Sequence, residues 1–146
     1  MICHSMGGLV CYAYLQRYGK SEFTPSKIVC LGSPFKGSMV AKKLAQTTQG
    51  RILLGVQASS DLVSGLERWP FPCHLGIIAG NKNIGAGRLL GLDSNRPGDG
   101  TVLVDETGIV GATDHIILPV SHSQMTFSTS VMLQIEHFYS NNRFKR

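Results

Sequence analysis

The chain has 146 residues, a length typical of one domain, and its 42% hydrophobic and 16% charged residues argue for a folded core and against disorder. Its formal net charge is +5, but the cations are scattered and no basic stripe is interleaved with aromatic residues, which argues against nucleic-acid binding. No run approaches the ~20 apolar residues of a membrane span, and no signal peptide is visible. We expect no transmembrane segment and favour a cytoplasmic location for the chain as printed, while its compartment stays open.

The first half of the chain begins with a helical pattern and continues into a strand. From Gly7 to Tyr18 apolar residues recur at spacings of three and four, and Gly19 predicts the end of this helix. Residues 27–31, KIVCL, are rich in β-branched residues and end in Gly-Ser-Pro, which predicts a buried strand. The following residues predict a loop that enters a short helix, and residues 51–72 predict short helices joined by loop.

The second half of the chain adds two strands and a last helix. Residues 74–80, HLGIIAG, predict a buried strand, and the glycine- and asparagine-rich residues 81–100 predict a long functional loop. Residues 115–120, HIILPV, predict a third strand. An amphipathic helix follows, with an apolar face made by Val131, Ile135 and Phe138. Because strands alternate with helices, we expect an α/β fold around a mostly parallel sheet.

Four cysteines are present, and their spacing matches no zinc site and no redox pair: Cys3, Cys11, Cys30 and Cys73. Three of them lie inside apolar runs, where cysteine usually serves as a small buried hydrophobic residue. We therefore expect reduced thiols, although an even number leaves one or two disulfides open. No pair of histidines has metal-ligand spacing, so no metal site is expected.

The segment CHSMGGLV, residues 3–10, places Ser5 in a turn of small residues directly before the first helix. A serine at a tight strand-to-helix turn exposes its hydroxyl above the sheet, and the backbone N–H after it can stabilise an oxyanion. The usual signature is Gly-x-Ser-x-Gly. Cys3 stands here in place of the first glycine and is small enough for the turn to form. The alternative is that Ser5 is only the N-cap of the helix.

A nucleophilic serine needs a base, and His122 is the best candidate. It follows the third predicted strand, so it lies at the carboxyl edge of the sheet, where Ser5 also lies. His115 begins the same strand and, at about 3.3 Å per residue, lies roughly 20 Å away, which predicts a surface or strand-cap role. His4 adjoins Ser5, but neighbouring strand residues point to opposite faces, so we expect it to lie away from the site. The remaining histidines are interpreted as structural: His74 and His137.

The base in turn needs an orienting acid, which in a strand-turn-helix arrangement lies between the serine and the histidine in chain order. Asp99, in RPGDGTVLV, follows the long loop at the same sheet edge, and the glycines on both sides of it permit an unusual turn. Taken alone, Asp99 is more typical of a turn aspartate. Asp93 is the second choice. Two later acids are interpreted as helix-start or surface residues: Asp105 and Glu106. Ser5, Asp99 and His122 follow one another in this chain order and are all expected at the same edge of the sheet, which favours a Ser-Asp-His triad.

Four stretches together resemble the lipase and serine esterase branch of the α/β-hydrolase family. They are CHSMGGLV (3–10), LGSPFKGS (31–38), GDGTVLVDET (98–107) and VSHSQM (120–125). The resemblance implies a partial α/β-hydrolase fold with Ser5 as nucleophile, Asp99 as acid and His122 as base, and the Met6 N–H as one oxyanion donor. It also implies a cap or lid at about residues 39–72, no cofactor, and a small acyl ester or lipid as substrate.

The serine turn lies unusually near the start of the sequence for this family. In the family four strands, and a loop with a second oxyanion N–H, precede the nucleophile strand, whereas four residues precede Ser5 here. We therefore expect the C-terminal half of a hydrolase with its N-terminal strands missing, whether as a fragment, a mis-assigned start or half of a split protein.

Two functional hypotheses follow. The chain is an ester hydrolase that forms an acyl-serine intermediate, or it is a non-catalytic fragment or interaction subunit that completes its sheet with another chain. With an uncovered sheet edge, the isolated polypeptide is expected to self-associate or to need a complementing N-terminal half. It is also expected to have little esterase activity.

Overall fold

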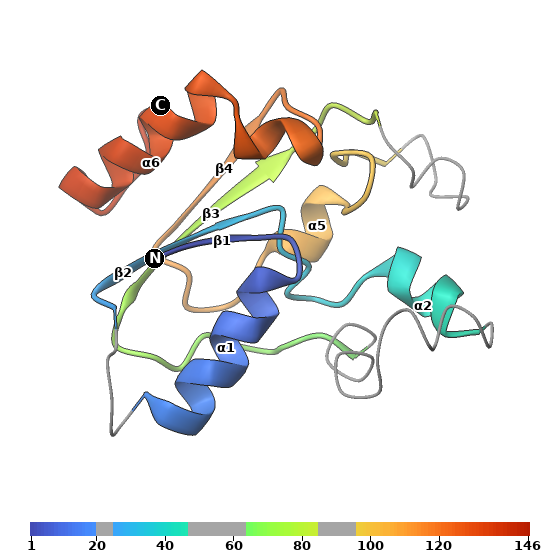
Figure 1. The fold of residues 1–146 in the computed structure, drawn as a ribbon, viewed down its shortest axis with the longest axis horizontal. Helices are drawn as coiled ribbons and strands as arrows, with labels where there is room; N and C mark the ends of the chain where they lie inside the picture. Colours follow the sequence, from blue (N-terminus) through green and yellow to red (C-terminus); the bar gives the residue numbers. More distant parts are fainter. Residues whose placement is uncertain (20–24, 47–63, 85–95) are drawn as a thin grey trace.

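A parallel sheet lies at the centre of the molecule (Figure 1). The computed structural model describes residues 1–19, 25–46, 64–84 and 96–146, and in these ranges the sheet has four strands in the order β1-β2-β3-β4. The strands are β1 (Ile2–His4), β2 (Lys27–Leu31), β3 (His74–Gly80) and β4 (Asp114–Leu118). All neighbouring pairs are parallel, so the expected α/β fold with a parallel sheet is confirmed.

The two central strands are buried because helices cover both faces of the sheet. Helix α1 (Gly7–Tyr18) covers one face, and α6 (Thr129–Asn141) covers the other (Figure 1). Alternate residues of β2 point to opposite faces of the sheet. Ile28 and Cys30 pack in the core beside α1, while Val29 and Leu31 pack in the core beside α6. The predicted bounds of β2, β3 and α1 are confirmed.

The last strand ends earlier than its apolar pattern indicates. The sequence predicts residues 115–120, whereas β4 ends at Leu118, directly before Pro119. Proline has no N–H to donate to a sheet, so the chain leaves the sheet there. Val120 is still buried, in the core beside α6. The early end of β4 leaves three residues between the strand and His122.

Short helices complete the described part of the chain. They are α2 (Met39–Ala45), α5 (Val104–Thr107) and the 3-10 helix η2 (Ser123–Thr126). The predicted short helix after residue 38 is therefore confirmed. Half of the predicted cap at 39–72 lies outside the described residues, as does the greater part of the long loop after β3. Among the described residues, no helix combines the length and apolar character that crossing a membrane requires.

The four cysteines are buried and free, as the sequence predicts. Cys3 of β1 lies opposite Cys30 of β2 in the parallel register, and both belong to the core beside α1. Cys11 reaches the same core from the helix, with its Sγ 3.5 Å from Met1 Sδ. These thiols act as small core side chains.

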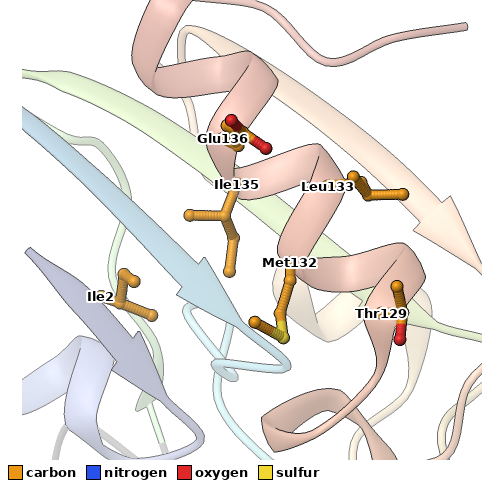
Figure 2. Close-up of a pocket in the computed structure, with 6 residues that line it drawn as sticks. All are labelled: Ile2, Thr129, Met132, Leu133, Ile135 and Glu136. Atoms are coloured by element: carbon orange, nitrogen blue, oxygen red, sulfur yellow. The ribbon is translucent and has the colours of Figure 1, made fainter.

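An apolar pocket of about 460 Å³ lies between β1 and α6 (Figure 2). It is lined by Ile2, Thr129, Met132, Leu133, Ile135 and Glu136. Three of these side chains expose more than half of their surface: Ile2, Met132 and Leu133. β1 is an edge strand of the described sheet, so this apolar surface lies beside unpaired backbone groups.

Close packing of α1 on the loop after β2 depends on Gly8. A Cβ at this position would lie 2.4 Å from Ser33 Oγ and 2.7 Å from Ser33 Cβ. At the neighbouring Gly7 a Cβ would meet nothing closer than Cys3 Cβ at 3.8 Å, which is an ordinary contact. The second glycine of the pair, not the first, therefore sets how near the helix lies to the sheet.

We predict that Gly8→Ala lowers the free energy of unfolding by about 1–3 kcal/mol, because it overpacks this contact. The matched control Gly7→Ala should keep the same stability or gain a few tenths of a kcal/mol from the better helix propensity of alanine. Urea unfolding followed by circular dichroism measures both. Equal losses in the two variants would contradict the assignment of the contact to Gly8.

Candidate active site

His122 and Asp99 form a hydrogen-bonded pair beyond the carboxyl ends of the strands. His122 Nδ1 lies 2.7 Å from Asp99 Oδ2. The Asp99 side chain is 1% exposed and that of His122 is 13% exposed, so the pair lies largely out of water while one side of the imidazole stays accessible. A second contact ties the two residues together, because the His122 backbone N–H donates to the Asp99 carbonyl at 2.9 Å.

The buried carboxylate of Asp99 is held by its own loop. Its Oδ1 accepts the backbone N–H groups of Thr101 at 2.9 Å and Val102 at 2.7 Å, while Oδ2 is left for His122. The Asp99 N–H donates to the Val102 carbonyl, which closes the turn. A buried charge is costly unless it is paired and hydrogen-bonded, and here both oxygens are satisfied. The turn role and the partner role of Asp99 are thus compatible.

Two glycines make room for this pair. Gly32 directly follows β2 with φ +54°, and a Cβ there would lie 2.9 Å from Asp99 Oδ2 and 3.1 Å from His122 Nδ1. Gly80 ends β3, where a Cβ would lie 2.8 Å from Asp99 Cβ. The ends of the two central strands therefore pack directly against the pair, and only glycine leaves it enough space.

Ser5 lies in a strained turn between β1 and α1. Its φ is +54°, the left-handed region that a residue with a side chain rarely adopts, and its N–H donates to the Leu31 carbonyl at 2.8 Å. The N-cap alternative for Ser5 is wrong, because Met6 occupies the N-cap position of α1 and no side chain caps the helix there. The strained conformation is that of a sharp strand-to-helix turn.

The turn that carries Ser5 lies beside the Asp99–His122 pair, as the contacts of neighbouring residues show. His4 precedes Ser5, and its ring centroid lies 4.6 Å from that of His122. Leu31, which accepts the Ser5 N–H, precedes the glycine that packs against the pair. The hydrogen bonds of His122 in the described part of the chain go to Asp99 and His4, and the Ser5 hydroxyl is not among them. Such contacts often tighten only when substrate binds.

Met6, the predicted oxyanion donor, lies at the N-terminus of α1. The first amides of a helix lack intrahelical partners, and within the described ranges the Met6 N–H donates to no acceptor. This amide follows the strained serine directly, and it lies at the positive end of a helix of 12 residues. It is therefore available to an anion that forms next to Ser5.

His4 belongs to the site, contrary to the expectation from strand alternation. Its Nε2 lies 3.0 Å from the His122 carbonyl oxygen, and the two rings are in contact. The expectation fails because His4 is the last residue of β1, beyond which the chain turns and η2 comes within reach. One feature of the sequence points to this role of His4: a histidine ends the strand directly before the serine.

The other predicted residues take structural roles. His115 is half-buried rather than exposed, and its Nε2 lies 3.1 Å from Thr107 Oγ1, while burial lowers its pKa. Glu106 is a helix-start acid as predicted, but it also bridges to α2 by accepting the Met39 N–H at 2.6 Å, and burial raises its pKa. Asp105 pairs with Arg96. Asp93 lies outside the described residues.

The remaining histidines bind groups away from the Asp99–His122 pair. His137 Nδ1 lies 2.8 Å from the Arg143 carbonyl, and His74 Nδ1 lies 3.5 Å from Thr113 Oγ1. Among the described residues, no cluster of three or more His, Cys, Asp or Glu side chains is arranged to hold a metal ion.

Comparison with solved structures identifies the architecture. The lipase BlEst2 of Bacillus licheniformis, in its mature form, superposes with a TM-score of 0.66 at 20% sequence identity. The alignment covers 95% of this chain and 63% of the lipase, so the chain spans less than two thirds of the length of that protein. The chain has a partial α/β-hydrolase fold. No protein-family model and no curated protein matches the sequence.

We predict that Ser5→Gly is more stable than Ser5→Ala by about 1 kcal/mol. Both variants lose the hydroxyl, but only glycine adopts the left-handed conformation at φ +54° without a steric cost. Urea unfolding of the two variants provides the measurement. At an ordinary helical position alanine would be the more stable of the two, and that order would contradict the strained turn.

Proposed function

We propose that this chain carries the catalytic residues of a carboxylic ester hydrolase of the lipase and esterase type, with Ser5 as nucleophile. The observation that supports it best is the buried Asp99–His122 pair beside a serine in a left-handed turn at a helix N-terminus. An imidazole oriented by a buried carboxylate is the arrangement that activates a serine hydroxyl. The structural likeness to a lipase agrees with this reaction class.

The proton positions follow from the hydrogen bonds. A carboxylate only accepts, so the proton between His122 and Asp99 belongs to His122 Nδ1 in the active form. In a neutral imidazole the other nitrogen, Nε2, is then unprotonated and serves as the base. Asp99 fixes this tautomer and stabilises the imidazolium that forms during the reaction, without itself taking the proton.

The proposed reaction has two halves. Ser5 Oγ attacks the ester carbonyl carbon while its proton passes to His122 Nε2, and the Met6 N–H stabilises the oxyanion of the tetrahedral intermediate. The intermediate collapses as His122 returns the proton to the departing alkoxide, which leaves an acyl-serine and an alcohol. A water molecule then attacks the acyl carbon while its proton passes to His122 Nε2. As the acyl–oxygen bond breaks, His122 returns this proton to Ser5 Oγ, which releases the carboxylic acid and free Ser5.

A second proposal concerns association of the chain through its edge strand. The apolar pocket between β1 and α6 adjoins unpaired backbone groups, and its exposed side chains favour contact with another polypeptide. We propose that a second copy of this chain binds there in the purified protein. This association is compatible with the ester hydrolase and also with a non-catalytic interaction subunit, so the serine variants below decide between those two.

We predict that Ser5→Ala lowers the rate of hydrolysis of a p-nitrophenyl ester by at least about a thousandfold, because the nucleophilic route is lost. A fluorophosphonate probe should label the wild-type protein at Ser5, as read by mass spectrometry of peptides. Asp99→Asn should lower the rate of ester hydrolysis strongly and Asp93→Asn only slightly. The reverse order would show that Asp93, not Asp99, is the acid of the triad. Equal esterase rates for wild type and Ser5→Ala, with no labelling, would favour the non-catalytic interaction subunit.

We also predict that the purified chain self-associates and that Leu133→Glu in the pocket reduces the association. A charge on this exposed side chain keeps the surface hydrated when another copy approaches. Light scattering measures the mass, and Val10→Glu, at a comparably exposed position on α1, is the control. A monodisperse monomer, or an equal effect of both variants, would contradict association through this pocket.

A further inference from the structure

The ring of His4 lies against the ring of His122, and the two residues are 118 positions apart in the sequence. His4 ends β1, the strand that leads into Ser5, while His122 lies on the segment after β4. The ring centroids are 4.6 Å apart with an interplanar angle of 43°. His4 Nε2 is also 3.0 Å from the His122 backbone oxygen. The contact therefore joins the edge strand β1 to the loop that carries the base.

Both sides of the His122 backbone are anchored. Its N–H donates to the Asp99 carbonyl at 2.9 Å, and its carbonyl oxygen receives the contact from His4. The imidazole is fixed separately through Nδ1 and Asp99 Oδ2 at 2.7 Å. Two of these three anchors come from the acid. The third comes from the residue next to the serine, and it ties the position of the base to that of the Ser5 turn.

The chemistry of the contact sets the tautomer of His4. A carbonyl oxygen only accepts, so His4 Nε2 must carry the proton and donate it. Burial lowers the pKa of His4, the nearby His122 lowers it further, and the bond to the His122 carbonyl and the charge of Asp99 oppose this shift. His4 is thus mainly neutral around pH 7 and adds no positive charge beside the imidazolium that His122 becomes. Within the described ranges, His122 and Asp99 are the titratable groups that face it.

We propose that His4 is a positioning residue for His122: its Nε2–H holds the His122 carbonyl, and its ring supports the imidazole, so that the base stays in register with Ser5. The proposal rests on the proposed function of Ser5 and His122. The hydrogen bond of His4 goes to the His122 backbone, so His4 acts through His122. Because it is bonded to Ser5 through one peptide, the end of β1 positions nucleophile and base together, and a displacement of about 1 Å between such groups can cost a hundredfold in rate.

Two substitutions separate the hydrogen bond from the bulk of the ring. His4→Gln keeps an N–H donor near the position of Nε2, while His4→Leu fills a similar volume without a donor. We expect His4→Leu to lower kcat for a p-nitrophenyl ester by about tenfold to a hundredfold, with KM changed less than about twofold, because positioning for the chemical step is lost. His4→Gln should recover kcat to within about threefold of wild type.

His137→Leu is the matched control. It removes a comparable contact, from His137 Nδ1 to the Arg143 carbonyl at 2.8 Å, on α6 away from the Asp99–His122 pair. We expect it to leave kcat unchanged. Equal kcat values for His4→Leu and wild type would overturn the proposal, and so would a loss in His4→Leu that His4→Gln does not recover.

Nitrogen-15 NMR of histidine-labelled wild-type protein tests the contact without any variant or activity, so a variant that fails to fold leaves the test intact. At a pH well above the usual histidine pKa of about 6.5, His4 should be the Nε2–H tautomer and His122 the Nδ1–H tautomer. An Nδ1–H tautomer at His4 would overturn the positioning role whatever the esterase rate. The expected tautomers in a protein whose Ser5 neither reacts with a fluorophosphonate nor turns over esters would support the contact and overturn the proposed function alone.

Discussion

The hydrogen bond from His122 to Asp99 is the interaction around which the carboxyl edge of this sheet is arranged. Asp99 is almost fully buried, so its charge needs donors on both oxygens, and its own turn supplies two of them. The third donor comes from His122, which reaches it because β4 ends before Pro119 and the chain returns over the sheet. Gly32 and Gly80 end the two central strands without side chains, which leaves room for the pair.

The parallel sheet converts separate loops into one site. All four strands run in the same direction, so the residues that follow β1, β2 and β4 meet at one edge. Ser5 is held at φ +54°, a conformation that a residue with a side chain rarely adopts, while Gly32 has the same φ without strain. Strain of this kind persists only where the surroundings over-determine it, and the bond from Ser5 to Leu31 is one such constraint.

The two faces of the edge strand β1 contact different parts of the molecule. On one face the strand contributes Cys3 to the core beside α1. On the other face Ile2 borders an apolar pocket beside α6, and His4 contacts His122. The short edge strand thus carries one residue of the candidate site and also borders exposed apolar surface, so the proposed association would involve the strand that leads into Ser5.

The sequence by itself determined the elements whose signals are local. The apolar runs of β2 and β3 and the helical spacing after Gly7 required no knowledge of distant contacts. The chain order of Ser5, Asp99 and His122 predicted a triad, and the structure brings Asp99 and His122 together. Only the tertiary structure decided that Asp99 is a partner as well as a turn residue, and that His4 faces His122. Periodicity describes which side of one strand a residue occupies, whereas these contacts join segments more than a hundred residues apart in one case and twenty-three in the other. They depend on where each strand stops and turns, which the packing of the whole sheet sets.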